Sequence, residues 1–295
     1  MAGAEIGDTV PNGNHQDILQ IMEHGHGLDV SRYHESFLGQ TLERRRQATG
    51  SQDAQAYARH LAGSREEAQA LGRALQNTYS EFFRDPLTFA ILEQLVLPGL
   101  AQAATLAGGA ELRVWSAGCA AGQEAYSVAI MLEDISAARE SGLSYRVFAT
   151  DIDEVQLAAG RRGLYERAAL GGVKLRHLEA YFAPQGQAHQ ILPRLRQRVD
   201  FSSHDLLDQR LASPPASIYG GFDLILCGNL LFYYRPALQR AMLDKLTRCL
   251  APGGYLATGR TERLLVEQWG GLTAVAAPAP VFRMGQTIQK DTACD

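Results

Sequence analysis

Cysteine is scarce in this sequence. Only four cysteines occur in 295 residues, at positions 119, 227, 249 and 294, and no two of them form a C-x-x-C pair. Their spacing therefore argues against a zinc site and against a disulfide framework. Reduced thiols are typical of the cytosol, so we expect a cytoplasmic protein without a bound metal.

Basic residues are not in excess, and long apolar runs are missing. The 28 Lys and Arg are outnumbered by 32 Asp and Glu, which gives a net charge of −4 and argues against broad nucleic-acid binding. No run approaches 18 apolar residues, so we expect neither a membrane-spanning helix nor direct membrane insertion. The first residues, MAGAEIGDTVPNGNHQD, contain neither a basic region nor an apolar region after it, so they do not predict a secretory signal.

The first third of the chain has a helical pattern. Residues 1–15 are polar and contain Gly, Pro and Asn, which predicts a disordered tail. From 16 to about 90, stretches such as YHESFLGQTLERRRQ and SREEAQALGRALQ have helical spacing, and no strand signal interrupts them. We expect a small all-helical domain over 16–90.

After a flexible joint at about 104–111, short apolar runs alternate with helical stretches. The expected strands are 112–118, 145–153, 198–207, 222–229 and 252–259, and the expected helices are 124–135, 154–163 and 236–250. This alternation is typical of an α/β, doubly wound sheet of parallel strands. Such sheets bind ligands beyond the carboxyl ends of their strands.

Small residues follow the first of these strands, and acids follow the second. Gly118 and Gly122 bracket the loop after strand 112–118, and Asp151 ends the strand about 30 residues later. Glycines allow a ligand to approach the backbone, and an acid in this place can bind ribose hydroxyls. The G-x-x-x-G spacing differs from the dinucleotide fingerprint, and Glu124 at the helix start would repel a phosphate. The pattern favours S-adenosylmethionine (SAM), which has no phosphate, over a nicotinamide dinucleotide or a purely structural turn.

Five blocks then carry a family resemblance: NTYSEFFRDP, VWSAGCAAGQEAYSVAI, FATDID, FSSHDLL and DLILCGNLLFYY. In order and spacing they resemble the CheR family of chemotaxis-receptor methyltransferases, over residues 20 to 284. The resemblance implies a Rossmann-like SAM methyltransferase domain at 91–286, with a small β-subdomain inserted around 181–200 and a short tail at 287–295. It also implies methylation of glutamate side chains on chemoreceptors, which leaves S-adenosylhomocysteine as product.

The resemblance also implies site residues. The cofactor contacts carried over by position, with Gly118 from the glycine loop, are Thr78, Ser80, Arg84, Gly118, Glu124, Asp151, Asp205, Leu206, Asn229 and Leu230. We expect Arg84 and Tyr233 to hold the substrate carboxyl, because arginine offers a planar fork that matches a carboxylate. A glutamate acceptor is already ionised at neutral pH, so the reaction needs no general base.

The helical domain is the expected partner surface. In the family, arginines of this region face the acidic helices of the receptor's cytoplasmic domain, which makes Arg44 and Arg45 docking candidates. The segment at 181–200 matches the position of the β-subdomain, which in some members binds a receptor C-terminal peptide as an added strand. Here the segment is short and Pro193 interrupts it, so we expect no such tethering.

Several positions depart from the family pattern. Thr78 and Ser80 stand where Asn and Thr are usual, Gln123 replaces a glutamate, and Gly228 replaces an arginine before Asn229. Three hypotheses therefore stay open: a chemoreceptor methyltransferase, a methyltransferase of the same fold that acts on another signalling protein, and a non-catalytic module that binds SAM or a receptor.

Overall fold

The computed structural model describes residues 13–76, 79–139, 142–217 and 221–285. Most of the two predicted tails and Thr78 lie outside the described residues. The chain divides into two compact units, which we call the smaller unit (residues 1–77 and 233–238) and the larger unit (78–232 and 239–295). The division falls at 77/78 and not near residue 90, because residues 86–106 form one continuous helical segment that packs into the core of the larger unit.

The smaller unit is all-helical, as the sequence pattern indicates. Its elements are α1 (Gly13–Gln20), a π-helical turn η1 (Ile21–Gly25), α2 (Glu35–Ala48), α3 (Ala54–Gly63) and α4 (Arg65–Leu75). The side chains of Asp53 and Ser64 cap α3 and α4 by accepting backbone N–H groups of the first turn. Residues 233–238 belong to this unit because Tyr33 and Tyr234 form an isolated antiparallel bridge and their rings stack at 5.4 Å.

The larger unit is built on a seven-stranded sheet with the order β6-β2-β1-β7-β8-β10-β9. Its strands are β1 (Leu112–Ala117), β2 (Tyr145–Asp151), β6 (Val199–Ser203), β7 (Phe222–Cys227), β8 (Leu250–Thr258), β9 (Leu272–Ala274) and β10 (Val281–Met284). The five strands from β6 to β8 are parallel, and β10 and β9 are antiparallel additions at one edge. The predicted doubly wound α/β fold is therefore confirmed.

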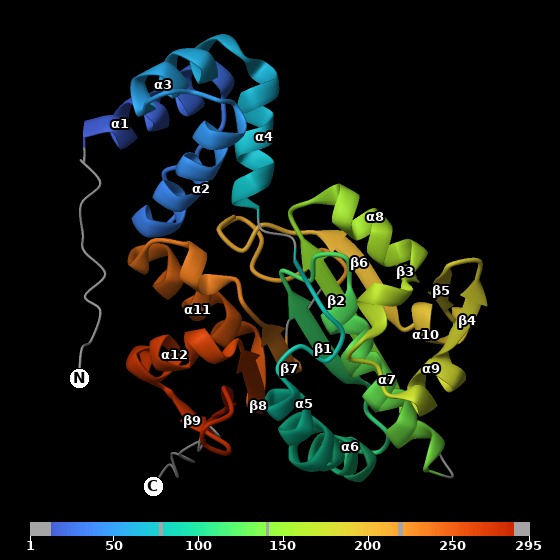
Figure 1. Ribbon diagram of the computed structural model, residues 1–295. Coiled ribbons are helices and arrows are strands. Elements are labelled where there is room, and N and C mark those ends of the chain that lie inside the picture. The colour runs from blue at the N-terminus through green and yellow to red at the C-terminus, as the bar shows by residue number, and fades with distance from the viewer. Residues whose placement is uncertain (1–12, 77–78, 140–141, 218–220, 286–295) are drawn as a thin grey trace, which may run out of the picture. The chain divides into compact units, whose positions relative to one another are not determined.

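Helices connect and cover these strands (Figure 1). They are α5 (Pro86–Ile91), η2 (Leu92–Val96), α6 (Leu97–Leu106), α7 (Gln123–Ala137), α8 (Glu154–Arg162), η3 (Arg167–Leu170), α9 (Leu175–Tyr181), α10 (Pro193–Arg196), η4 (Leu231–Tyr233), α11 (Pro236–Cys249), η5 (Arg260–Glu262) and α12 (Arg263–Trp269). A second sheet of order β3-β5-β4 contains β3 (Leu164–Glu166), β4 (Phe182–Gln185) and β5 (Ala188–Ile191). This small antiparallel sheet begins before the expected segment at 181–200, because β3 also pairs with β5.

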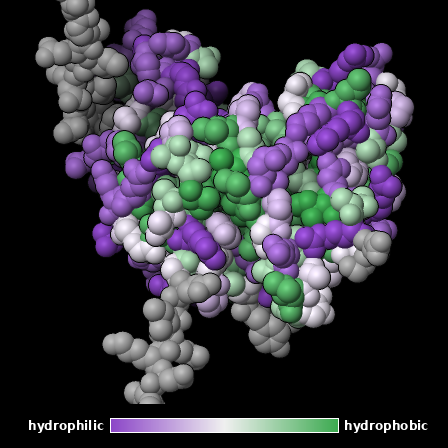
Figure 2. Space-filling model, turned by 90° about the horizontal axis from the view of Figure 1, so that it is seen from below, coloured by the Kyte–Doolittle hydropathy of each residue, from purple (hydrophilic) through white to green (hydrophobic). Residues whose placement is uncertain are grey.

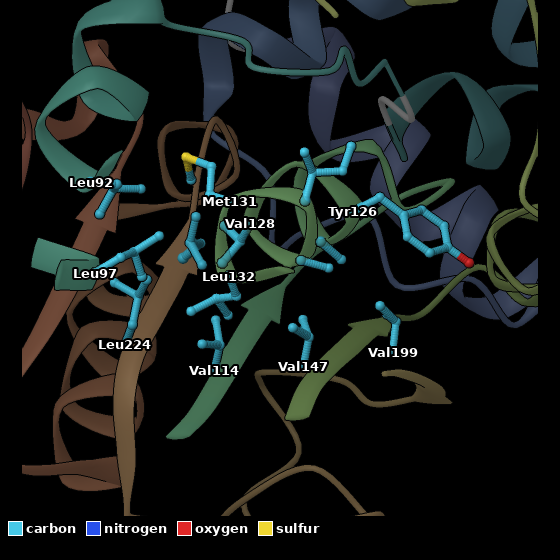
Figure 3. Packing of buried hydrophobic residues seen from close by; sticks show 14 of the residues in the cluster. Leu92, Leu97, Val114, Tyr126, Val128, Met131, Leu132, Val147, Val199 and Leu224 are labelled. Atoms are coloured by element: carbon cyan, nitrogen blue, oxygen red, sulfur yellow. The ribbon is translucent and has the colours of Figure 1, made fainter. Parts of the chain in front are cut away.

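The core lies between the sheet and the helices α5–α7. Figure 3 shows Val128, Met131 and Leu132 of α7 meeting Val114 and Val147 of the neighbouring strands β1 and β2. Adjacent strand residues point to opposite faces, so the aromatic residues Trp115, Phe148 and Phe222 pack together on the other side of the sheet. With both faces covered, the carboxyl ends of the strands are left to carry the loops of the site.

The helical segment 86–106 is the one described segment long and apolar enough to cross a membrane by length and composition. Its apolar run is not continuous in the sequence, because Glu93 and several polar residues interrupt it. About a third of its most apolar window is buried, through core residues such as Leu92, Leu97 and Ala101. Leu87, Leu95 and Leu106 are exposed. Figure 2 shows hydrophobic residues gathered in the middle of the face seen from below, the side on which α5 and α6 lie in Figure 1. The buried residues of the segment belong to the hydrophobic core of the larger unit.

Candidate active site

The loop after β1 is shaped by left-handed backbone and by lack of space. Gly118, Ala120 and Gly122 have φ values of +76°, +46° and +89°. A Cβ on Gly118 would lie 2.8 Å from a methyl carbon of Leu230, and one on Gly122 would lie 2.7 Å from the ring of Phe201. Both glycines are thus required by conformation and by packing. The contact of Gly118 also brings the loop after β1 next to the loop after β7.

Asp151 links the loops after β1 and β2. Its Oδ2 accepts the backbone N–H of Ala120 at 2.9 Å, and its Oδ1 accepts the N–H of Asp153 at 3.0 Å. Burial raises the pKa of this carboxyl, and the backbone N–H groups act in the opposite direction. The side chain stays partly exposed, so its remaining lone pairs can accept further hydrogen bonds from a ligand.

Glu124, in the first turn of α7, directs its carboxyl into the protein while part of the residue stays accessible. Oε1 accepts the hydroxyl of Ser116 at 2.7 Å, and a Cβ on Gly228 would lie 2.9 Å from Oε2. Burial raises the pKa of Glu124 to about 7, the Ser116 hydrogen bond opposes this, and the nearby charge of Glu262 adds to it. Glu124 is therefore a carboxyl whose charge is poorly compensated by the protein itself.

The loop after β7 holds Asn229 and Leu230. Asn229 has a φ of +60°, and the backbone N–H groups of Asn229 and Leu230 are donated to the carboxylate of Glu262, at 2.9 and 2.7 Å. Sequence reasoning missed Glu262. The signal was the G-x-x-E pattern of residues 259–262, which resembles a capping box at a helix start.

Arg84 lies in a strained segment before α5. Its neighbours Phe83 and Asp85 have φ values of +52° and +64°. The guanidinium donates to the backbone oxygen of Tyr79 at 3.2 Å and lies 5.3 Å from the centre of the Tyr79 ring. Its positive charge lowers the pKa of Glu124, which places the two side chains in the same electrostatic environment. The neighbouring Asp85 forms its ion pair with Arg260, at 2.9 Å.

Asp205 and Leu206 follow β6, at the same edge of the sheet. Asp205 Oδ1 accepts the N–H of Leu207 at 2.8 Å, and Leu206 is 7% exposed. The buried ammonium of Lys245 donates to the backbone oxygens of Asp205, Leu206 and Asp208, which fixes this loop. Sequence reasoning missed Lys245 because its contacts are to backbone atoms about 40 residues away.

Ser80 and Tyr233 are less closely tied to this group of loops. Ser80 is partly exposed in the segment that leads to Arg84. Tyr233 belongs to the smaller unit, where its backbone oxygen accepts the N–H of His34 at 2.7 Å and its ring lies 4.5 Å from that of Phe37. The role of Tyr233 beside a substrate stays a prediction.

The two docking candidates on α2 have different surroundings. Arg44 is exposed and donates to Thr41 within its own helix. Arg45 is partly buried and forms a bidentate pair with Glu67, at 2.9 and 2.5 Å, and Glu67 also accepts the hydroxyl of Tyr57. Arg45 therefore has an internal structural role in the helical unit.

Backbone strain marks the same loops. In the described part of the chain, the non-glycine residues with left-handed φ are Phe83, Asp85, Ala120 and Asn229. They flank Arg84, occupy the loop after β1 and begin the loop after β7. Such conformations are costly and gather at functional sites.

Buried polar atoms without a hydrogen-bond partner indicate whether the site suits a polar ligand. In the described part of the chain, seven residues have buried side-chain polar atoms without a hydrogen-bond partner. Ser202, His204 and Thr258 lie at the carboxyl ends of β6 and β8 and Gln123 begins α7, whereas His177, His189 and Arg196 lie elsewhere. The thiol of Cys119 is not a nucleophile, because burial raises its pKa well above the usual value. Donors, acceptors and uncompensated carboxylates at this edge fit SAM, which carries hydroxyls, amino groups and a sulfonium.

Comparisons with known proteins identify the family of this chain. Residues 78–276 match the family model described as CheR methyltransferase, SAM binding domain. A 104.1 kDa uncharacterised protein of Rhodobacter capsulatus is 31% identical over 91% of this chain, and the chain spans 28% of that protein. A probable biofilm formation methyltransferase, WspC, of Pseudomonas putida is 33% identical over 87% of this chain, which spans 58% of that relative. The chemotaxis protein methyltransferase of Salmonella typhimurium is 32% identical, with 83% of this chain and 82% of the relative covered. The chain therefore belongs to the CheR methyltransferase family, and residues 78–276 form its SAM-binding domain.

Proposed function

We propose that this protein transfers a methyl group from SAM to glutamate side chains of chemoreceptors in the cytoplasm and so forms methyl esters. The supporting observation is that the loops after β1, β2 and β7 meet at one edge of the sheet. Asp151 accepts the N–H of Ala120, a Cβ on Gly118 would meet Leu230, and a Cβ on Gly228 would meet Glu124. Arg84 is close enough to Glu124 to lower its pKa. Methyl transfer to an acidic acceptor requires a basic side chain for the acceptor and carboxylates for the cationic cofactor. Arg84 beside Glu124 meets both requirements.

The chemistry needs orientation more than proton transfer. Bound SAM supplies an electrophilic methyl group, and the acceptor glutamate is ionised because its usual pKa is about 4.3. Arg84 binds and orients this carboxylate, and Tyr233 borders it. Glu124 and Asp151 balance the positive charge of the cofactor. Alignment of the two reactants can lower the barrier by roughly 7–11 kcal/mol.

The receptor-facing surface is α2. Arg44 is exposed and available to contact an acidic helix of the receptor. Arg45 is paired with Glu67, so its role in docking is a supporting one. Docking of this kind raises the association rate and weakens with salt. No membrane insertion is involved, because the apolar segment 86–106 contributes to the core. We expect no tethering to a receptor C-terminal peptide, since β4 and β5 are only four residues each.

A second candidate is methylation of a signalling protein outside chemotaxis. The relative WspC, named for biofilm formation, aligns with 87% of this chain. Gly228, which departs from the family arginine, removes a charge beside Glu124 and gives the site a different electrostatic balance.

A methyl-transfer assay distinguishes the hypotheses. Radiolabelled SAM is incubated with receptor-containing membranes, and the label is released as methanol by alkali if it is an ester. We expect base-labile label with the wild type, at least about 100-fold slower labelling with Arg84→Gln, and near-normal labelling with the control Arg263→Gln, whose side chain pairs with Glu267 on α12.

Other outcomes of the assay point elsewhere. Alkali-stable label means a different acceptor atom, and no label on receptors but label on another signalling protein supports the second candidate. Binding of S-adenosylhomocysteine without any transfer supports a non-catalytic module. An Arg84→Gln variant as fast as the wild type would overturn the role of Arg84.

A further inference from the structure

Glu262 accepts four backbone N–H groups. Its Oε1 accepts from Leu230 at 2.7 Å and from Leu231 at 2.6 Å, and its Oε2 accepts from Asn229 at 2.9 Å and from Gly259 at 2.7 Å. The side chain is fully buried, at 0% exposure. Three of the four donors are consecutive residues of the loop after β7, so a single carboxylate from the turn after β8 fixes the path of that loop.

The loop cannot easily hold this shape without the carboxylate. Asn229 has a left-handed φ of +60°, a conformation that is uncommon outside glycine although asparagine tolerates it better than most residues. Consecutive N–H groups that converge on one point would be left unpaired in the interior, which is costly. Gly259 completes the arrangement, because a Cβ there would lie 2.8 Å from both the backbone and side-chain nitrogens of Asn229 and 2.8 Å from Glu262 Oε2.

The fixed loop reaches the rest of the site. A methyl carbon of Leu230 lies 2.8 Å from where a Cβ on Gly118 would be, so the position of Leu230 also limits the loop after β1. From the same turn, Arg260 holds Asp85, the neighbour of Arg84, in an ion pair at 2.9 Å. The segment Gly259–Glu262 therefore contacts both flanks of the proposed site.

We propose that Glu262 is a positioning residue for methyl transfer, and that its carboxylate holds Asn229 and Leu230 in the conformation that binds the cofactor. This inference rests on the proposed function, since Asn229 and Leu230 are assigned there to the cofactor. Glu262 itself does not touch the reacting groups and acts through the backbone of the loop.

Glu262→Gln tests the proposal, because the amide keeps the size of the side chain but replaces one acceptor oxygen with a donor. Whichever way the amide turns, two N–H groups lose their acceptor. The matched control is Asp223→Asn at the opposite end of β7, where the carboxylate accepts the backbone N–H of Arg113 at 2.8 Å. Each variant is titrated with S-adenosylhomocysteine by calorimetry, its melting temperature is measured, and amide hydrogen exchange is followed at residues 229–231.

The expected result is a Kd for S-adenosylhomocysteine raised at least about tenfold in Glu262→Gln, with faster exchange confined to residues 229–231. Asp223→Asn should bind as the wild type does, even if its melting temperature falls. In the transfer assay, the KM for SAM should rise more than kcat falls, a split that general destabilisation would not produce. Unchanged affinity and exchange in Glu262→Gln would overturn the proposal.

Two further outcomes are decisive. If Glu262→Gln does not fold, Gly259→Ala addresses the same loop by steric displacement of Asn229, and normal binding by that variant contradicts the proposal. If the wild type binds no S-adenosylhomocysteine, the proposed function fails. The exchange rates of residues 229–231 then still show whether Glu262 orders the loop.

Discussion

At the scale of single residues, the site contains two buried carboxyls that the protein compensates to different degrees. Glu124 and Glu262 each have a pKa raised mainly by burial, and the charge of Glu262 raises that of Glu124. Glu262 is compensated by four backbone N–H groups, whereas Glu124 has the Ser116 hydroxyl, the backbone N–H of Gly228 and the charge of Arg84. A positively charged ligand would thus be stabilised chiefly by Glu124.

Glu124→Gln should make the protein's stability less sensitive to pH. A carboxyl with a pKa near 7 when folded and 4.5 when unfolded binds more protons in the folded state between those values, so its contribution to stability falls as the pH rises from about 4.5 to about 7. We expect the wild type to lose about 2–3 kcal/mol between pH 4.5 and pH 7.5 relative to Glu124→Gln, measured by denaturant unfolding.

The control for this experiment is Glu179→Gln, an exposed carboxyl on α9. Its pH dependence should parallel that of the wild type. If the curve of Glu124→Gln also runs parallel to that of the wild type, Glu124 is charged at low cost and the electrostatic description of the site is wrong.

Gly118→Ala should destabilise the protein and weaken nucleotide binding. The left-handed φ costs roughly 1–2 kcal/mol for a side chain, and displacement of Leu230 adds about 1–3 kcal/mol. Gly186→Ala is the matched control, because its φ of +62° is similar but nothing lies within 4 Å of the new Cβ. Denaturant melts should show the larger loss for Gly118→Ala, and equal losses would mean that contact with Leu230 is unimportant.

At the scale of elements, the helical segment 86–106 joins the Arg84 segment to the core. Its two faces differ: Leu92 is 0% exposed and Leu95 is 55% exposed. Leu92→Ala should therefore cost about 2–5 kcal/mol of unfolding free energy, and Leu95→Gln should stay within about 0.5 kcal/mol. Chemical denaturation of the two variants checks this. A large loss for Leu95→Gln would show that the outer face is also packed against something.

The sequence predicted the elements better than it predicted their junctions. Alternation of apolar runs located β1, β2, β6, β7 and β8, because buried parallel strands leave a strong local pattern. The loops with Gly118 and Asp151 were found from the residue types that follow strands. Glu262 and Lys245 escaped because they act on backbone groups of other loops, and such contacts leave no local periodicity. The assignment of Tyr233 to the helical unit was missed for the same reason.

At the scale of the whole molecule, the smaller unit is assembled from two distant parts of the chain. Residues 233–238, from the end of η4 to the start of α11, join it, and Tyr234 is 7% exposed where it stacks on Tyr33. A cut at 77/78 therefore does not separate two complete folding units.

A fragment of residues 78–295 should therefore be less stable than the full chain. Loss of residues 1–77 uncovers Tyr234 and leaves the N–H of Arg235 without its partner, the backbone oxygen of Arg32. We expect a lower melting temperature and increased binding of a hydrophobic dye. A fragment that melts as the full chain does would contradict this, and sedimentation would show whether self-association masks the exposed surface.

The left-handed residues around the site also bear on protein engineering. Phe83, Asp85, Ala120 and Asn229 are sites where a stability-guided design would choose glycine to relieve the backbone. Glycine at these positions also gives the site loops more conformational freedom when no cofactor is bound. A variant that gains heat resistance in this way should therefore turn over more slowly. Thermostable versions of this protein are better sought in the helical unit and on the small antiparallel sheet.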